Sequence, residues 1–99
     1  MKITVPNKKT LTAPTVHLNG TTGSTLFGEL HDALTAVNVA IEKVCDACPH
    51  GRDYYVEGPG AYEAARKQFN ERLDALKEIA VELEALCDEV DRQMEVRKR

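Results

Sequence analysis

The chain has 99 residues, of which 42% are hydrophobic and 29% charged, and its formal net charge is −3. This length allows one small domain, and the apolar content is too high for a disordered chain. Basic and acidic side chains are nearly balanced, so direct binding of nucleic acid is not expected, because such proteins usually carry a positive excess.

Residues 1–21 are expected to form an extended N-terminal arm. Pro6, Pro14 and Gly20 interrupt this segment, and it shows no helical periodicity. Four apolar residues of the arm are candidates for packing against a helix or a neighbouring subunit: Ile3, Val5, Val16 and Leu18.

A first helix is predicted over residues 24–48. Thr22 or Ser24 can cap it, since a side-chain oxygen there accepts a hydrogen bond from the free N–H groups of the first turn. Apolar residues then recur every three or four positions and form one stripe: Leu26, Leu30, Leu34, Val37, Ile41, Val44 and Cys48. Pro49 and Gly51 end the helix, and residues 49–58 form a connector.

A second helix is predicted over residues 59–97, beginning after Gly58 with proline at a tolerated first position. Its apolar residues alternate spacings of four and three, as in a coiled-coil seam: Phe69, Leu73, Leu76, Ala80, Leu83, Cys87, Val90 and Met94. A second apolar line, formed by Ile79 and Leu86 with Ala75 and Val81 nearby, widens this surface.

These elements predict an all-α fold, a two-helix antiparallel hairpin with an extended N-terminal arm. The arm would cover residues 1–21 and the helical hairpin domain residues 22–99. Because the second helix is longer, we expect its end, from Cys87 to Met94, to lack a partner within the chain. Two helices also bury little surface, so a helical homo-oligomer built from this overhang and the second apolar line is predicted.

The connector is richer in functional side chains than a chain reversal requires. Within six residues, from His50 to Tyr55, it holds an imidazole, a guanidinium, a carboxylate and two phenols. Arg52 could simply pair with Asp53 or cap the first helix, and the tyrosines could plug the end of the hairpin. Two adjacent tyrosines in a loop cannot easily both point inward, however. One is then left to stack on a ligand while Arg52 holds phosphate or carboxylate.

A second polar cluster, His17-Leu18-Asn19-Gly20-Thr21-Thr22, precedes the first helix. It offers an imidazole, an amide and hydroxyls near a helix N-terminus, which favours an anion. The alternative is a helix cap preceded by a glycine turn. In an antiparallel hairpin this cluster and the connector lie at opposite ends. They could meet only between subunits, or if the arm folds back along the helix.

Cys45, Cys48 and Cys87, with His50, have the composition of a zinc site. All three cysteines fall on the apolar stripes, however, where a free cysteine acts as a small hydrophobe. A redox Cys-x-x-Cys pair normally lies at a helix N-terminus, whereas this pair ends a helix. We therefore interpret the cysteines as core residues and predict no metal. Their odd number also argues against a disulfide framework.

No catalytic set emerges from the sequence. It contains no phosphate-binding glycine loop, no H-E-x-x-H motif and no nucleophile elbow, so we expect a protein that is not an enzyme and needs no cofactor. It also shows no apolar leader and no run near the roughly 20 apolar residues of a membrane span. These features predict a cytoplasmic protein without a membrane partner.

The pairing of His17-Leu18-Asn19-Gly20-Thr21 with Gly51-Arg52-Asp53-Tyr54-Tyr55 resembles a group of small, mostly uncharacterised proteins encoded in phage and prophage genomes of proteobacteria. The likeness covers most of residues 15–90. Those proteins often carry alanines near the end of the first helix, where this chain has Cys45 and Cys48. The resemblance implies a protein that acts in the host cytoplasm by occupying a host component.

Among such roles, the two polar clusters favour binding of a nucleotide-like ligand, whose sequestration would counter host defence signalling. Tyr54 or Tyr55 would stack on a base, Arg52 would hold phosphate, and Asn19, Thr21 and Thr22 would donate hydrogen bonds. His17 and His50 would be auxiliary. The alternative is a protein-interaction module that binds a host or virion protein through its helical surface. A DNA mimic would need more negative charge, and a zinc-dependent enzyme is the least favoured hypothesis.

Overall fold

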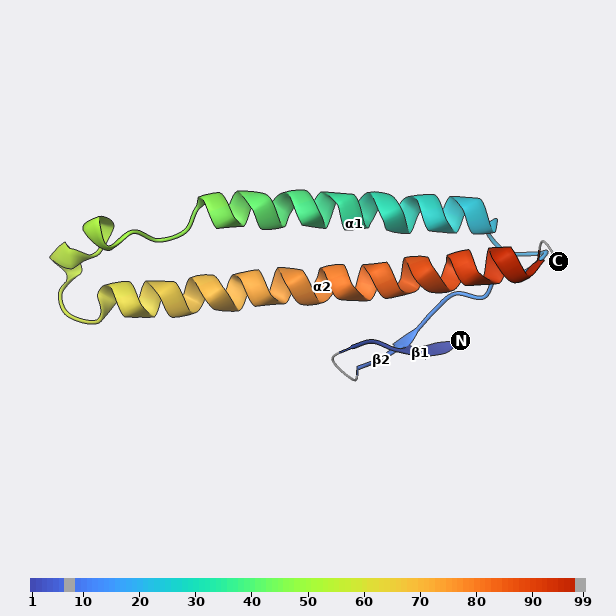
Figure 1. The fold of residues 1–99 in the computed structure, drawn as a ribbon, viewed down its shortest axis with the longest axis horizontal. Helices are drawn as coiled ribbons and strands as arrows, with labels where there is room; N and C mark the ends of the chain where they lie inside the picture. The colour runs from blue at the N-terminus through green and yellow to red at the C-terminus, as the bar shows by residue number, and fades with distance from the viewer. Residues whose placement is uncertain (7–8, 98–99) are drawn as a thin grey trace.

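The computed structural model describes residues 1–6 and 9–97 of the chain. Two short strands, β1 (Lys2–Thr4) and β2 (Thr10–Thr12), precede helix α1 (Gly23–Asp46). Two 3-10 turns, η1 (Gly51–Asp53) and η2 (Tyr55–Glu57), then lead to helix α2 (Ala61–Arg97). The helices pack side by side in opposite directions, which confirms the predicted helical hairpin (Figure 1). The molecule is a rod of 63 × 24 × 19 Å.

Helix α1 begins where the sequence places a capping residue. The hydroxyl of Thr22 accepts a hydrogen bond from the Thr25 N–H at 3.2 Å. Of the two predicted capping residues, Thr22 and Ser24, it is therefore Thr22 that caps the helix. The predicted apolar stripe is half-buried from Leu26 to Val44, and its last residue, Cys48, is exposed. The helix ends at Asp46, two residues earlier than expected, because residues 47 and 48 form tight turns ahead of Pro49.

Helix α2 begins at Ala61, two residues after the predicted start. Gly58 and Gly60 have φ angles of 105° and 87°, a region that favours glycine and is incompatible with a helix. The predicted seam is confirmed: Phe69, Cys87 and Val90 are buried, and the other seam residues are half-buried.

The relative position of the two helices differs from the prediction. We expected the end of α2, from Cys87 to Met94, to lack a partner. In fact Met94 lies against Gly23 at the start of α1, where an added Cβ would stand only 2.6 Å from the Met94 side chain. The connector is long enough to run past the end of α1 and to cover the first turns of α2, with Tyr54 against Tyr62. The turns of α2 that extend beyond α1 are therefore the first ones, and the connector covers them.

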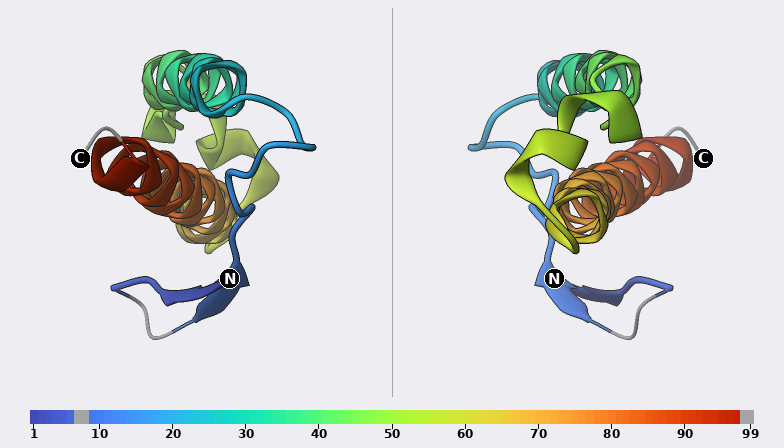
Figure 2. Two further views of the ribbon diagram at one scale, coloured as in Figure 1. Left: turned by 90° about the vertical axis from the view of Figure 1, so that its right-hand side faces the viewer. Right: turned by 90° about the vertical axis from the view of Figure 1, so that its left-hand side faces the viewer.

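The arm is a small β-hairpin that folds back along the C-terminal half of α2. β1 and β2 pair antiparallel, with Ile3 opposite Leu11 (Figure 2). Val5 and Ala13 are 2% and 3% exposed, so these arm residues contribute to the core. Leu18 is 90% exposed, so of its two expected partners a helix of the same chain is ruled out, and packing against a neighbouring subunit stays a prediction.

The core of the single chain is thin. Only five hydrophobic residues among those described are buried: Val5, Ala13, Phe69, Cys87 and Val90. The accessible surface is 7073 Å², whereas a compact monomer of 11.0 kDa would expose about 5600 Å². The radius of gyration is 18.8 Å, compared with about 13 Å for a compact domain of this length. Along residues 1–6 and 9–97 the structure has no helix with the length and apolar character of a membrane span.

Candidate functional site

The connector is a chain of tight turns that leaves most of its side chains exposed. Each turn is closed by a main-chain hydrogen bond, first from the Asp53 N–H to the His50 carbonyl at 3.0 Å and then from the Tyr54 N–H to the Gly51 carbonyl at 3.0 Å. The Gly58 N–H likewise donates to the Tyr55 carbonyl at 3.3 Å. These backbone groups bond to one another within the connector, so they need no side chain as a partner. The side chains are therefore available for other contacts.

The two adjacent tyrosines have different surroundings, as expected from the sequence. Tyr54 is half-buried and packs against Tyr62 on the first turn of α2, with ring centroids 6.3 Å apart and a tilt of 40°. Arg66 lies over the other ring of this pair, 5.7 Å from the centroid of Tyr62. Tyr55 is 76% exposed and its neighbour Val56 is 78% exposed. Tyr54 therefore anchors the connector, whereas Tyr55 offers a flat surface to a ligand.

Arg52 projects from η1 and is exposed, as are His50 and Asp53. Within residues 1–6 and 9–97, Arg52 forms no ion pair with Asp53 and donates no hydrogen bond to the end of α1. Neither of the structural roles considered for this arginine is therefore realised. Its guanidinium remains available to an anion beside Tyr55.

The second cluster lies at the start of α1, beside the end of α2. The Gly20 N–H donates to the His17 carbonyl at 3.2 Å, and the His17 ring covers Gly20 so closely that a Cβ there would stand 2.7 Å from Nε2. An open cleft of about 400 Å³ runs between His17, Leu18, Met94 and Arg97.

The hydrogen-bonding groups of this second cluster are not equally available. The Thr22 hydroxyl is already bonded to the Thr25 N–H and, at 2.9 Å, to the Thr25 hydroxyl. Its main task is to cap α1, so it is a weaker candidate for a ligand donor than the sequence suggests. Asn19 and Thr21 are exposed and face solvent from the loop before the helix.

The two clusters do not meet within one chain. One precedes α1 and the other follows it, and a helix of 24 residues separates its ends by about 36 Å. The arm folds back along α2 but leaves His17 to Thr22 at the start of α1 (Figure 1). The predicted site residues therefore form two half-sites at opposite ends of the rod.

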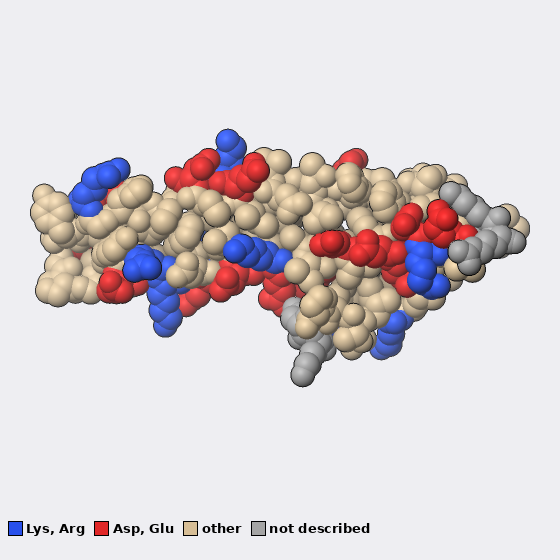
Figure 3. Space-filling model, in the orientation of Figure 1, with Lys and Arg blue, Asp and Glu red and all other residues tan. Residues whose placement is uncertain are grey.

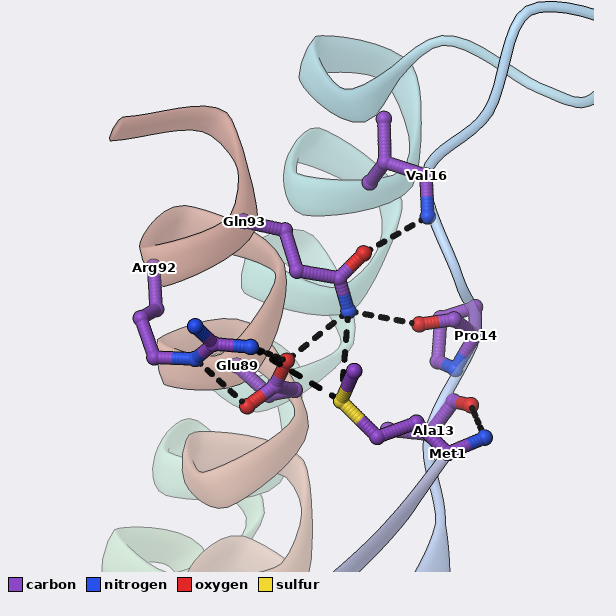
Figure 4. A network of polar contacts seen from close by, with 7 residues as sticks. All are labelled: Met1, Ala13, Pro14, Val16, Glu89, Arg92 and Gln93. Atoms are coloured by element: carbon purple, nitrogen blue, oxygen red, sulfur yellow. Dashed lines mark hydrogen bonds and ion pairs between the residues drawn. The ribbon is translucent and has the colours of Figure 1, made fainter. Parts of the chain in front are cut away.

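A network that sequence reasoning missed fixes the arm beside the second cluster (Figure 4). The Gln93 side chain on α2 is only 8% exposed. Its oxygen accepts the Val16 N–H at 2.7 Å, and its nitrogen donates to the Pro14 carbonyl at 3.0 Å and to Glu89 at 2.8 Å. One amide thus satisfies two backbone groups of the arm. The neighbouring Arg97 donates to the Val16 carbonyl at 2.8 Å.

Charged groups continue this network along α2. Arg92 donates two hydrogen bonds to the Glu89 carboxylate, at 2.7 and 3.0 Å. These bonds hold the pKa of Glu89 below its usual value against the opposing effect of burial, and Gln93 and the N-terminal ammonium add to the lowering. The ammonium of Met1 itself donates to the Ala13 carbonyl at 3.1 Å.

The sequence predicted that all three cysteines are core residues, but only one of them is buried. Cys87 is buried, and burial, aided by Asp88 and Glu84, raises the pKa of its thiol. Cys45 and Cys48 are exposed at the other end of α1: Cys45 lies on a solvent-facing position of the last helical turn, and Cys48 lies two residues beyond the end of the helix. Cys87 is therefore too distant to join them. No group of three metal-binding side chains is found in the part of the chain that the structure describes.

Basic and acidic side chains both occur along the length of the rod on the face that Figure 3 shows. On the face shown in Figure 3, lysines and arginines alternate with aspartates and glutamates. An open depression of about 440 Å³ on α2 is lined by side chains of both signs, including Arg66, Lys67 and Asp74. Because all of its lining residues belong to one helix face, this depression is an ordinary solvated surface rather than an enclosed site.

No protein-family model, curated protein or solved structure matches the chain. The function of the protein is therefore inferred from the geometry of the two half-sites.

Proposed function

We propose that the protein is a self-associating, non-enzymatic binding protein for a nucleotide-like ligand, and that sequestration of this ligand counters host defence signalling. The observation that carries the proposal is the position of the two half-sites at the two ends of α1, on a rod with a half-exposed apolar face. Two copies packed side by side in opposite directions bring the start of one α1 next to the connector of the other. Each such pair contains two composite sites.

The surface of the single chain supports self-association. It exposes roughly 1500 Å² more than expected for a compact monomer of its mass, which exceeds the roughly 800 Å² that each partner buries in a standard protein interface. Ile79, on the second apolar line, is 46% exposed, and Leu86 is half-buried. An interface on this side of the hairpin covers apolar surface that the arm leaves open.

The chemistry of the half-sites suits a nucleotide. From one copy, Tyr55 stacks on a base and Arg52 binds a phosphate, with His50 beside them. From the other copy, Asn19 and Thr21 donate hydrogen bonds, and His17 borders the cleft. Tyr54 supports the connector from behind. This division of tasks accounts for a connector that carries more functional groups than a chain reversal needs.

The first experiment is native mass spectrometry of freshly purified protein with and without a panel of cellular signalling nucleotides. The expected result is a discrete oligomer that gains nucleotide in proportion to its composite sites. Ile79→Asp should dissociate the oligomer and abolish nucleotide uptake, because it places a charge in the interface. Gln68→Asp, at an exposed position of the same helix, should change neither.

Variants at the connector separate binding from assembly. Tyr55→Ala and Arg52→Ala should each weaken nucleotide binding in calorimetric titration by at least about fivefold. Loss of one stacked base costs about 1–3 kcal/mol, and loss of a hydrogen bond to a charged group about 1.5–3 kcal/mol. Val56→Ala, at a similarly exposed neighbour without a ring, and Arg72→Ala, an equal loss of charge on α2, are the matched controls.

A mixing experiment tests whether each site is shared between copies. In a pure oligomer of either variant, Asn19→Ala or Arg52→Ala weakens binding at every site. When the two variants are mixed and reassembled, a mixed pair has one site with both substitutions and one site with neither. Partial recovery of binding in the mixture is therefore expected. Absence of recovery, with mixed oligomers visible in the mass spectrum, would contradict a shared site.

The second candidate is a protein-interaction module that binds a partner through its helical surface, and exposed apolar residues on both helices favour it. Val39 on α1 and Ile79 on α2 are 49% and 46% exposed. If an oligomer binds none of the nucleotides, affinity purification from host lysate is the next test. In that case Ile79→Asp or Leu86→Asp should abolish capture of the partner, whereas Arg52→Ala should leave it intact.

A further inference from the structure

Cys45 and Cys48 lie where α1 passes into the connector, and the structure brings their backbones together. The Cys48 N–H donates a hydrogen bond to the Cys45 carbonyl at 3.2 Å. A bond between residues three apart closes a turn whose end Cα atoms are within about 7 Å. Disulfide-linked cysteines usually have Cα atoms about 4.4–6.8 Å apart. The turn therefore holds the two cysteines near the separation that a disulfide requires.

Both thiols are accessible and weakly engaged. Cys45 and Cys48 are exposed, and the only hydrogen bond from either thiol in the described part of the chain is a long contact of 3.7 Å from the Cys48 sulfur to the Pro49 carbonyl. Cys87, in contrast, is buried near the other end of α1. An oxidant in solution reaches the first two cysteines and not the third.

We propose that Cys45 and Cys48 are a site of reversible oxidation that forms an intramolecular disulfide at the end of α1. The oxidant is a low-molecular-weight disulfide such as oxidised glutathione. One cysteine thiolate attacks a sulfur of the oxidant and releases one glutathione thiolate. The second cysteine thiolate then attacks the protein sulfur of this mixed disulfide and releases the other. The protein loses two protons and two electrons, and the oxidant is reduced to two thiols.

The position of the pair makes it a modification site and not a catalyst of thiol exchange. Catalytic Cys-x-x-Cys pairs lie at helix N-termini, where the positive end of the dipole stabilises the thiolate. Here Cys45 lies in the last turn of α1 and Cys48 just beyond it, at the negative end of the helix dipole, so the reduced form gains no such stabilisation. A dithiol whose reduced form is not stabilised retains its disulfide rather than passing it to another protein.

The bond would fix the turn from which the connector starts. Pro49 and His50 follow directly, and Arg52 is four residues beyond Cys48. The inference is independent of any ligand, since it depends only on the two thiols and the turn between them.

The test is incubation of the full chain in glutathione buffers from reducing to oxidising, followed by alkylation and mass spectrometry. Reduced native protein should take up two labels, with a third only after denaturation. Oxidised native protein should take up none and should be lighter by two hydrogen atoms. Trypsin cleaves after Lys43 and Arg52, so both cysteines fall in one peptide, residues 44–52, which should carry this mass loss.

Two variants complete the experiment. Cys87→Ser should lose only the third label, the one taken up after denaturation, and should form the disulfide as the unaltered chain does, because the buried thiol takes no part. Cys48→Ser should instead keep one glutathione on Cys45, since no second thiol is near to displace it. Peptide 44–52 bearing two glutathione adducts, or cysteines linked between two chains, would overturn the proposal.

Discussion

The two ends of the rod use their polar side chains in different ways. At the end where the arm meets α2, polar groups bond to the protein itself: Gln93 and Arg97 bind the backbone of the arm, and Arg92 binds Glu89. At the connector end, Arg52 and Tyr55 face solvent and contribute no such bonds. Polar residues that bond internally stabilise the fold, whereas those left exposed in an ordered turn are available for recognition.

The largest expected difference between the two ends comes from placing a charge at each. Val90→Asp puts a carboxylate at a fully buried position beneath the arm, and it should lower the free energy of unfolding by about 4 kcal/mol or more. Val56→Asp puts the same charge on the exposed connector and should change stability by no more than about 0.5 kcal/mol. Urea denaturation followed by circular dichroism measures both, and equal effects would invalidate the comparison.

Loss of the Gln93 amide should have the next largest effect. Gln93→Ala leaves the Val16 N–H and the Pro14 carbonyl without their partner, at a cost of about 1–3 kcal/mol. Hydrogen exchange at the Val16 amide should accelerate, because the arm loses its anchor. Gln68→Ala, at an exposed glutamine of the same helix, is the control. Unchanged protection of Val16 in Gln93→Ala would show that the arm is held in another way.

Two glycines of α1 should respond in opposite directions. Gly23→Ala adds a methyl group against Met94 and should destabilise the protein by about 1 kcal/mol. Gly28→Ala, with no atom within 4 Å of the added Cβ, should stabilise it by about 0.5–1 kcal/mol through helix propensity. Thermal unfolding of both variants compares the closely packed start of the helix with its open middle. The same sign of change at both positions would argue against the contact between Gly23 and Met94.

The smallest effect is the acid dependence of the arm. Because the folded-state pKa of Glu89 is lowered, its contribution to stability is complete at neutral pH. The contribution begins to disappear as the pH falls through the usual glutamate value of 4.5, and it is lost below the lowered pKa. Glu89→Gln should therefore reduce stability at pH 7 and show a smaller further loss between pH 5 and pH 3. An acid response equal to that of the unaltered protein would show that other carboxylates dominate.

The sequence predicts the helices well and their alignment poorly. The spacing of Phe69, Leu73 and Leu76 is periodic over many turns, and such patterns follow directly from helix geometry. Helix lengths alone do not say which end of α2 is paired. The alignment depends on the path of the connector, where Gly58 and Gly60 with positive φ delay the start of α2.

The arm and its anchor show where local patterns are insufficient. Each strand of the arm has only three residues, too few for an alternating pattern to be distinctive, and its pairing is stabilised by tertiary contact with α2. Gln93 looks like a surface residue in isolation. Its position, however, continues the second apolar line of Ile79 and Leu86 at a regular spacing of seven. The signal in the sequence was that a polar residue, Gln93, stands where the apolar pattern predicts an apolar one.

The sequence indicates which residues belong to the candidate site, but it does not show whether the two clusters come together. His17 to Thr22 and His50 to Tyr55 stand out by composition, and the structure shows one tyrosine of the connector inside and one outside. Whether the half-sites meet depends on contacts between copies, which no pattern within one chain encodes. The cysteines at the end of α1 were misassigned for a related reason: the apolar period runs through Cys48, while the helix itself ends two residues before it.

The rod shape of the hairpin has a consequence for its behaviour in solution. A particle 63 Å long and about 20 Å across meets more friction than a sphere of equal mass, because its tumbling and drift are governed by its length. Gel filtration separates molecules by hydrodynamic size, so a single chain should elute ahead of globular standards of 11.0 kDa. Two rods lying side by side gain width but little length. The elution volume will therefore change less on pairing than the mass does, and sedimentation equilibrium or light scattering will distinguish the two forms where chromatography does not.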